Sequence, residues 1–432
     1  MSEPIHIGLL GLGTVGSGVV QLLEQNGAAI TQKLGRPLNI SRILVRDRER
    51  PRQVVVDPAV LTTDPQSILA DPDIAIIVEV MGGTGAARDY ILQSLHRGKS
   101  VVTANKDLLA LYGKELFDAA EAHATEILFE ASVGGGIPII HPLKECLAGN
   151  RIHQVMGIVN GTTNYILTKM SREGRNFAEV LREAQDLGYA EADPTADIEG
   201  DDAARKMAIL ASIAFSTRIT YPDVYKEGIS RITTQDISYA ADLGYAVKLL
   251  GIAREDGEGV EVRVHPALVP LSHPLAAVSD VFNAIFVEGD AVGETMFYGR
   301  GAGSLPTASA VVGDIMEAAR NLQHRTRGRI SCTCFYDKPV KPIGDIITKY
   351  YLRLIVADRP GVLATIAGVF GDREVSLASV IQERMLGELA ELVLITHHVR
   401  EQNLQEALHV LAGLPVVKEI ACILRVEGGE AR

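Results

Sequence analysis

The chain has 432 residues, of which 47% are hydrophobic and 22% charged, and its formal net charge is −12. This composition is typical of a folded globular protein with more than one domain, and it excludes an intrinsically disordered chain. The negative charge argues against nucleic acid as a main partner, because phosphate binding requires concentrated lysine and arginine.

The N-terminus and the apolar runs show no targeting or membrane segment. Residues 1–5 contain no basic region ahead of an apolar stretch, so no signal peptide is predicted. Apolar runs such as Ile74–Val80 are far shorter than the roughly 20 residues of a membrane helix. Cys332 and Cys334 lack the two-residue gap of common zinc and redox pairs, which favours structural cysteines. We expect a cytoplasmic protein without membrane contact.

The first 145 residues or so alternate apolar runs rich in Ile and Val with segments of helical spacing. The expected strands are Ile5–Leu10, Ile40–Val45, Ile74–Val80, Ser100–Thr103 and Ile127–Phe129. Short apolar strands that alternate with helices predict an α/β fold, with a parallel sheet covered on both faces.

A glycine-rich loop, Gly11-Leu12-Gly13-Thr14-Val15-Gly16, directly follows the first expected strand and opens a helix. The first glycine allows a tight turn, the second lets a pyrophosphate approach the backbone, and the third lets helix and strand pack closely. The helix N-terminus adds free N–H groups and a partial positive charge. A plain tight turn would also use glycine, but the strand–loop–helix context predicts a Rossmann-type dinucleotide site. Its expected residues are Gly11, Gly13, Thr14, Val15 and Gly16.

The residues after the second strand leave the choice between NAD and NADP open. Asp47 suits the ribose hydroxyls of NAD, whereas Arg46 or Arg48 suits the 2′-phosphate of NADP. The alternative for Arg48 and the charges beyond it is a solvated run on an exposed turn.

From about residue 138 to 320 the pattern changes to that of an α+β substrate domain. The expected helices are Phe177–Leu187, Asp201–Phe215 and Pro306–Arg320, and the expected strands are Val260–Val264 and Ala284–Val287. The sequence does not decide whether the helix that starts at Pro306 folds back onto the first domain.

Six carboxylates fall between Glu191 and Asp202, and Asp202 shares a helix face with Lys206, four residues on. Acids at a helix start also occur on plain surfaces, where the helix dipole stabilises them. A Ca²⁺ or Mg²⁺ site is a further alternative, although the calcium-loop spacing is absent. The functional interpretation is a dehydrogenase site: alcohol oxidation requires a positioned proton acceptor, burial lowers a lysine pKa, and carboxylates suit the ammonium of an amino-acid substrate.

Residues 321–349 show little periodicity and indicate a linker. The following 80 residues or so have a β-α-β-β-α-β order, which predicts a ferredoxin-like unit. Its expected elements are Tyr350–Ala357, Val362–Phe370, Val375–Ile381, Leu389–Thr396, Leu404–Leu411 and Val416–Val426.

Together these features resemble the homoserine dehydrogenase family, in its long form with a C-terminal ACT domain. The motifs that carry the resemblance are GLGTVG, Val102–Lys106, Glu130–Pro138, Asn160–Asn164 and the acid–lysine stretch through Lys206. The resemblance implies NAD(P)-dependent interconversion of L-homoserine and L-aspartate 4-semialdehyde, in threonine, methionine and isoleucine biosynthesis. It implies four segments: a Rossmann-type domain over 1–137, a substrate domain over 138–320, a linker over 321–349 and an ACT domain over 350–432.

The same resemblance implies a role for each matching residue. Lys206 would be the catalytic acid/base with Lys106 in the same pocket, and the substrate would lie against Glu191, Asp197 and Asp202. The implied cofactor contacts beyond the glycine loop are Thr103, Lys106, Gly188 and Gly303, in addition to Arg46, which the pattern after the second strand already suggests. A sodium ion would be held by Glu130, Val133, Gly135 and Ile137, mostly through backbone carbonyls. The motif at Asn160 would otherwise be a turn capping a helix at Tyr165, and Gly134–Gly136 a flexible turn into a helix started by Pro138.

In the C-terminal unit, Asp358 and Gly361 match the ACT signature, where a small amino acid binds between paired domains. The resemblance implies feedback by threonine and a homo-oligomer. An ordinary strand–helix turn would explain the same residues. Two other functions remain open: a different ACT-bearing dehydrogenase, for example for a 2-hydroxy acid, and a sensor that binds dinucleotide and amino acid without turnover.

Overall fold

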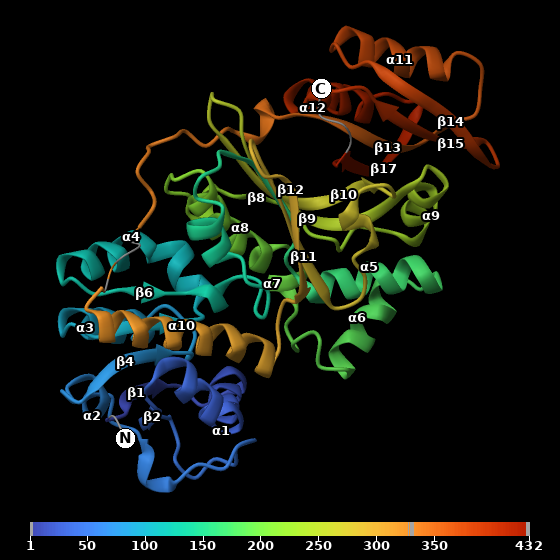
Figure 1. The fold of residues 1–432 in the computed structure, drawn as a ribbon. Helices are drawn as coiled ribbons and strands as arrows, with labels where there is room; N and C mark the ends of the chain where they lie inside the picture. Colours follow the sequence, from blue (N-terminus) through green and yellow to red (C-terminus); the bar gives the residue numbers. More distant parts are fainter. Residues whose placement is uncertain (1–2, 327, 329–331, 429–432) are drawn as a thin grey trace. The chain divides into compact units, whose positions relative to one another are not determined.

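The structure is a computed structural model that describes residues 3–326, 328 and 332–428. Positions 327 and 329–331 of the expected linker, and the last four residues of the expected ACT region, lie outside the described residues. The chain forms two compact units, which are described separately (Figure 1). Unit 1 comprises residues 1–155, 205–224 and 283–338, and unit 2 comprises residues 156–204, 225–282 and 339–432.

Unit 1 contains a six-stranded parallel sheet with the order β3-β2-β1-β4-β5-β6. Its strands are β1 (Ile5–Leu10), β2 (Leu38–Leu44), β3 (Leu61–Thr62), β4 (Ile74–Glu79), β5 (Ser100–Thr103) and β6 (Ile127–Leu128). The intervening helices are α1 (Thr14–Leu34), α2 (Gln66–Leu69), α3 (Ala86–His96) and α4 (Lys106–Ala122). The central strands are almost fully buried, as a sheet covered on both faces requires. This is the predicted Rossmann-type sheet, and its order reverses between β1 and β4, where such sheets bind ligands.

Helix α10 (Ser304–His324) packs along α1 within unit 1 (Figure 1). The Ser304 hydroxyl donates to the Thr14 carbonyl at 2.7 Å, and Val311 and Ile315 join the core that covers the sheet. The helices approach so closely that a Cβ on Gly18 would lie 2.6 Å from the Ser304 carbonyl oxygen. The helix expected at Pro306–Arg320 therefore extends further at both ends, and it folds onto the parallel-sheet part of the unit.

The rest of unit 1 contains further strands, irregular turns and most of a helix. Strands β12 (Gly293–Arg300), β11 (Phe282–Gly289) and β7 (Ile152–Ile158) follow one another in that order in a second sheet, with β11 in unit 1 from Asn283 onward and β7 in unit 1 up to Val155. Helix α8 (Asp201–Ala214) belongs to unit 1 from Arg205 onward. The expected helix at Pro138 is instead a π-helix, η3 (Pro142–Cys146), preceded by the 3-10 turn η2 (Glu130–Ser132).

Unit 2 contains a sheet in the order β9-β10-β17-β13-β15-β14. Its strands are β9 (Tyr245–Glu255), β10 (Val260–Pro270), β17 (Val417–Val426), β13 (Ile347–Ala357), β15 (Leu389–Thr396) and β14 (Leu377–Leu386). The last four, with α11 (Val362–Asp372) and α12 (Glu401–Ala412), form the predicted ferredoxin-like unit. Strand β10 runs six residues beyond the expected end at Val264, because it pairs with β9 along its whole length.

The helices of unit 2 are α5 (Gly161–Glu173), α6 (Phe177–Asp186), α7 (Thr195–Ile198) and α9 (Thr234–Asp242). Helix α5 begins four residues before the expected start at Tyr165, because Asn160 is its N-cap and accepts the Thr163 N–H at 2.9 Å. The remaining short elements of unit 2 are β8 (Tyr225–Lys226), β16 (Val399–Arg400), η5 (Pro274–Ala277) and η6 (Ile343–Asp345). Those of unit 1 are η1 (Pro58–Val60) and η4 (Tyr221–Asp223).

The expected linker over 321–349 is held by its neighbours where the structure describes it. The Tyr336 N–H donates to the Ser216 carbonyl within unit 1, and the Lys341 N–H donates to the Val260 carbonyl within unit 2, both at 2.9 Å. Helix α10 and strand β13 occupy its two ends.

Across the described residues, every helix is too short or too polar to cross a bilayer.

Candidate functional site

A cavity of about 710 Å³ lies at the carboxyl end of β1 in unit 1. The glycine loop forms one wall, and Gly13 is the N-cap of α1, whose first residue is Thr14. A Cβ on Gly16 would lie 2.2 Å from the Gly11 carbonyl oxygen, whereas a Cβ on Gly13 would have nothing within 4 Å. The third glycine thus permits the close packing, and the second leaves open space for a phosphate at the helix N-terminus. Val15 does not line the cavity and packs against the core.

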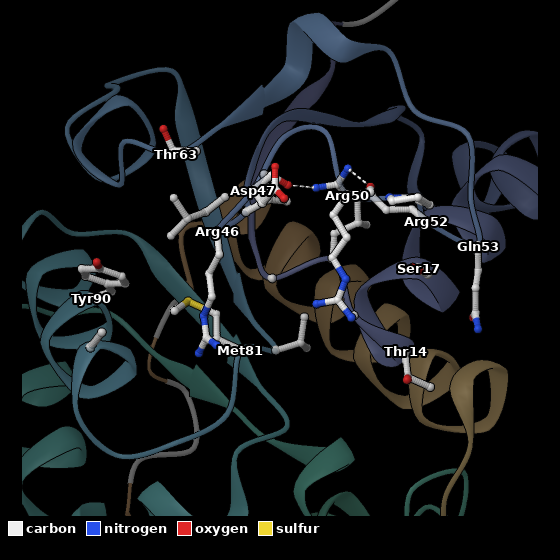
Figure 2. A pocket seen from close by; sticks show the side chains of 18 residues that line it. Thr14, Ser17, Arg46, Asp47, Arg50, Arg52, Gln53, Thr63, Met81 and Tyr90 are labelled. Carbon is white, nitrogen blue, oxygen red and sulfur yellow. Dashed lines mark hydrogen bonds between the residues drawn. The ribbon is translucent and has the colours of Figure 1, made fainter. Parts of the chain in front are cut away.

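Two arginine side chains extend into this cavity (Figure 2). Figure 2 shows Arg46 directed toward Met81 and Arg50 directed toward Thr14. Arg52 is used within the loop, where it donates to the backbone carbonyls of Asp47, Arg48 and Arg50. Arg48 donates to the Pro58 carbonyl at 3.0 Å and does not line the cavity. Arg50 and Arg52, beyond Arg48, therefore line the cavity, although Arg48 and Arg50 are exposed as a solvated turn would be.

A buried carboxylate, Glu79, organises the ends of β4 and β5. Its side chain is fully buried and accepts the Thr103 hydroxyl at 2.7 Å and the N–H groups of Met81 and Gly82 at 2.8 and 3.1 Å. The Thr103 oxygen in turn accepts the Asn105 N–H. Because its hydroxyl is committed to Glu79, Thr103 has only its backbone for a direct polar contact with a cofactor. The sequence pointed to Thr103 but not to Glu79, although an acid ending an apolar parallel strand was a readable signal.

The two candidate lysines lie on elements that an ion pair joins within unit 1. Lys106 is the first residue of α4, which Asn105 caps, and Lys206 lies on α8 with only 9% of its surface exposed. Their chain neighbours Asp107 and Arg205 form an ion pair of 3.1 Å. This contact holds the Lys206 segment of α8 against the start of α4, directly after the carboxyl end of β5.

In unit 2, one amide joins two of the predicted substrate-binding acids. The Asn160 amide nitrogen donates to Asp197 Oδ1 at 2.7 Å and to Asp202 Oδ2 at 2.8 Å. Two carboxylates held this close form a negative site that suits an ammonium group. Glu191 is exposed, and Gly188 follows the end of α6 with a φ of +73°.

The predicted cation loop has backbone oxygens suited to a metal ion. Glu130, Val133, Gly135 and Ile137 are buried, and no hydrogen bond within the described part of the chain ends on their carbonyl oxygens. The Glu130 carboxylate is turned away to the backbone N–H groups of Ile139, Ile140 and His141, at 2.5 to 2.8 Å. Burial opposes its charge, but hydrogen bonds from His141 and the backbone outweigh burial and lower the Glu130 pKa. Glu130 could therefore contribute its carbonyl rather than its carboxylate.

The remaining predicted residues lie at helix starts. Gly303 is the N-cap of α10, with a φ of +121°, and the next residue is hydrogen-bonded to Thr14 at the start of α1. Asp358 and Gly361 are exposed in the turn between β13 and α11, where Gly361 is the N-cap.

Cys332 and Cys334 are free thiols beside Arg218. The hydrogen bond with the Cys334 thiol, assisted by Arg218 at 2.9 Å from the Cys332 sulfur, lowers the pKa of Cys332 to about 5. No pattern along the chain indicates this environment, because Arg218 lies more than 100 residues before Cys332.

Comparison with known proteins gives a consistent result along the whole chain. Three family models match: "Homoserine dehydrogenase, NAD binding domain" over residues 11–130, "Homoserine dehydrogenase" over 138–316 and "ACT domain" over 350–415. A homoserine dehydrogenase of Bacillus subtilis is 48% identical over 428 residues, which cover 99% of each chain. The crystal structure of a homoserine dehydrogenase from Thiobacillus denitrificans is 44% identical, covers 98% of each chain and superposes with a TM-score of 0.92. A hyperthermophilic archaeal homoserine dehydrogenase in complex with NADPH is 29% identical, with a TM-score of 0.62, over 73% of this chain and 98% of that one.

Proposed function

The chain belongs to the homoserine dehydrogenase family and is an oxidoreductase with an NAD-binding domain and an ACT domain, and we propose that it interconverts L-homoserine and L-aspartate 4-semialdehyde. The observation that carries the proposal is the Arg205–Asp107 ion pair, which holds the Lys206 segment of α8 at the carboxyl end of the Rossmann-type sheet. Ligands of open parallel sheets bind at this end.

Each group has a distinct task in the proposed reaction. The nicotinamide cofactor supplies or accepts the hydride when bound. Lys206 takes the proton from the homoserine hydroxyl, or returns it to the aldehyde oxygen in reduction, as a general base or acid. Lys106 stabilises the oxygen as charge develops on it. Asp197 and Asp202, joined by Asn160, bind the substrate ammonium together with Glu191.

The cavity favours NADP over NAD. Two guanidinium groups, on Arg46 and Arg50, extend into it beside the end of β2, and a fork of this kind matches the geometry of a phosphate. Asp47 lines the same wall and carries one negative charge. The two guanidinium groups outweigh this charge, so that the site still attracts the 2′-phosphate. The open space at Gly13 and the start of α1 suit the pyrophosphate. Gly188 and Gly303 remain proposed backbone contacts.

We also propose a sodium site at the backbone oxygens of Glu130, Val133, Gly135 and Ile137. Buried carbonyl oxygens without a hydrogen-bond donor are unfavourable unless a cation or water satisfies them, which supports the assignment. Replacing sodium by choline in an assay of homoserine oxidation tests whether this loop binds sodium.

The chain is proposed to act in the cytoplasm, as a homo-oligomer, in the biosynthesis of threonine, methionine and isoleucine. Its ACT domain is proposed to bind threonine as an effector, with Asp358 meeting the ammonium and Gly361 allowing close approach. The matched ranges support the proposed segments 1–137, 138–320, 321–349 and 350–432.

Replacing Lys206 by alanine tests the proposed reaction. Loss of a general acid/base is expected to lower kcat for homoserine oxidation by about 10²- to 10⁴-fold. The dissociation constant for NADPH, measured by fluorescence, is expected to stay unchanged, because Lys206 does not line the dinucleotide cavity. The same assay, run with NADP and with NAD, is expected to give the higher kcat/KM with NADP.

Lys114→Ala is the matched control, since Lys114 is an exposed lysine on α4 that forms a surface ion pair with Asp118. It is expected to keep the activity of the unmodified chain. A Lys206→Ala protein with near-normal turnover would refute the assignment of the acid/base.

A further inference from the structure

Behind the proposed sodium loop, unit 1 gathers a histidine and several carboxylates whose task the dehydrogenase reaction does not explain. His141 and Glu145 lie on consecutive turns around the π-helix η3, and Glu317 comes from α10. One side-chain ligand atom from each of these three residues lies within 4.8 Å of the others. The closest pair is His141 Nε2 and Glu317 Oε2, at 2.7 Å.

The imidazole of His141 is held in a fixed orientation by a second carboxylate. Its Nδ1 lies 3.1 Å from Glu130 Oε2, the same oxygen that accepts the His141 backbone N–H. Histidines that bind a metal typically use one ring nitrogen for the metal and give the other N–H to a carboxylate. With Nδ1 directed to Glu130, Nε2 is the nitrogen that faces Glu317.

An independent observation comes from Asp314, one turn before Glu317 on α10. Its side chain is 1% exposed, and Oδ2 accepts the Glu130 N–H at 2.9 Å. The other oxygen, Oδ1, is buried without a hydrogen-bond partner among the described residues, and it lies 3.8 Å from His141 Nε2. Burial raises the pKa of Asp314 and favours its neutral form, whereas a cation beside Oδ1 and His141 Nε2 would compensate the charged form.

We infer that His141, Glu145 and Glu317, with Asp314 behind them, bind a divalent transition-metal ion at a site separate from the backbone-carbonyl loop. One imidazole nitrogen and several carboxylate oxygens form a ligand set that suits Mn²⁺ or Zn²⁺. A neighbouring cavity of about 470 Å³, lined by Glu145, Glu317, Arg320 and His324, provides an entry path from solvent. Glu130 joins this site to the sodium loop, since its carboxylate holds His141 and its carbonyl belongs to the loop.

The alternative occupant of the same position is a proton. Hydrogen bonds to Glu130 and Glu317 raise the pKa of His141 to about 11, so that without a metal the imidazolium pairs with both carboxylates. In that case the cluster is an ion pair only, and it has no specific affinity for a metal ion. A direct binding measurement separates the two alternatives.

The probe is Mn²⁺, because the thiols of Cys332 and Cys334 would compete for Zn²⁺ but favour Mn²⁺ little. The full chain is treated with a chelator, transferred to buffer with constant sodium, and titrated with Mn²⁺ while the free ion is measured by electron paramagnetic resonance. We expect one saturable Mn²⁺ per chain. Glu317→Gln removes a ligand oxygen and is expected to weaken the affinity by about 10-fold or more.

Glu145→Gln is the second ligand variant, and its more exposed position makes it tolerant of substitution. Glu145→Gln is also expected to weaken Mn²⁺ binding. The matched control is Glu121→Gln, an exposed change on α4, which is expected to leave the Mn²⁺ affinity unchanged. Absence of a stoichiometric Mn²⁺ site, or affinity that is the same in both ligand variants and the control, overturns the inference. The experiment measures Mn²⁺ binding and not turnover. A failure of the metal-site proposal is therefore distinct from any failure of the proposed dehydrogenase reaction.

Discussion

The glycines of the first loop lack a side chain for different reasons. At Gly16 a methyl group would collide with the Gly11 carbonyl oxygen at 2.2 Å, a backbone atom that cannot move without separating α1 from β1. A Cβ added at Gly13 would meet no described residue within 4 Å apart from its chain neighbours, so the missing side chain leaves room for a ligand instead. Gly16 is thus required by the packing of α1, and Gly13 is proposed to leave room for the cofactor phosphates.

Two alanine substitutions distinguish these tasks. Gly16→Ala is expected to destabilise the protein by about 1–3 kcal/mol, as overpacking typically does, and to lower its thermal unfolding midpoint. Gly13→Ala is expected to keep the midpoint but to raise the dissociation constant for NADPH about tenfold, because the methyl occupies the space of the phosphates. Calorimetry and fluorescence titration provide the two measurements.

Gly27→Ala, on the same helix and with nothing within 4 Å, is the control. It is expected to stabilise α1 slightly, by about 0.5–1 kcal/mol, as alanine does in a helix interior. If Gly13→Ala lowered the midpoint as much as Gly16→Ala, the division of tasks would be wrong.

At the scale of elements, strand β17 attaches the ACT sheet to β10 within unit 2. Ala267 and Leu268 pair in parallel with Arg425 and Val426, so the sheet continues without a break. Just beyond β17, the buried Glu427 carboxylate meets Arg254 and Arg263, each at 2.9 Å. Burial alone would raise the Glu427 pKa, but attraction to Arg263 and Arg254 outweighs burial and lowers it.

Glu427→Gln is expected to destabilise unit 2 by about 3–5 kcal/mol at pH 7, because it leaves buried arginines without a carboxylate. The difference in the free energy of unfolding between this variant and the unmodified chain depends on pH. A carboxyl group whose folded pKa is lowered contributes stability above its unfolded value of about 4.5 and loses it as the pH falls toward the folded value. The difference is therefore expected to shrink below pH 4.5, by about 1.4 kcal/mol per pH unit.

Urea unfolding at pH 7 and at pH 3.5, followed by circular dichroism, measures this difference. Glu419→Gln is the control, because Glu419 lies exposed on the same strand and pairs across the sheet only through its backbone. A pH-independent difference would show that the ion pairs do not carry the stability of this junction.

At the scale of the whole molecule, the proposed effector site and the proposed catalytic lysine belong to different units. If threonine binds the ACT domain and the two sites are coupled, the coupling free energy of about 1–3 kcal/mol that is typical of allostery changes affinity roughly 5- to 150-fold. We expect L-threonine to raise the homoserine concentration needed for half-maximal rate within that range.

Asp358→Asn is expected to bring the ratio of rates with and without threonine close to one, because the amide no longer attracts the effector's ammonium. Asp372→Asn, an exposed change at the end of α11, is the control expected to keep the ratio. Initial rates over a threonine titration give the ratio. An unchanged threonine response in Asp358→Asn would place the effector elsewhere.

The sequence predicted much of the local structure because local structure depends on local patterns. Period and composition predicted the parallel sheet and the β-α-β-β-α-β order of the ACT unit, and both are confirmed. Of the six strands that the structure describes in the parallel sheet, the two-residue β3 was not predicted. The ends of the elements were predicted less accurately, since they depend on caps and on pairing partners. With Asn160 as its N-cap, α5 begins earlier than expected, and β10 continues further than expected because it pairs with β9. The roles of Lys206, Glu191 and the cation loop came from the family resemblance, and they remain proposals.

What the sequence determined by itself was the type of those elements that have a clear hydrophobic period, and the family of the whole chain, because hydrophobic period and glycine spacing act between residues close along the chain. What only the tertiary structure decided were contacts between residues far apart: α10 against α1, Glu79 beneath Thr103, and His141 between Glu130 and Glu317. Packing brings together groups as far apart along the chain as the Ser304 hydroxyl and the Thr14 carbonyl, 290 positions, and no pattern along the chain encodes such a contact.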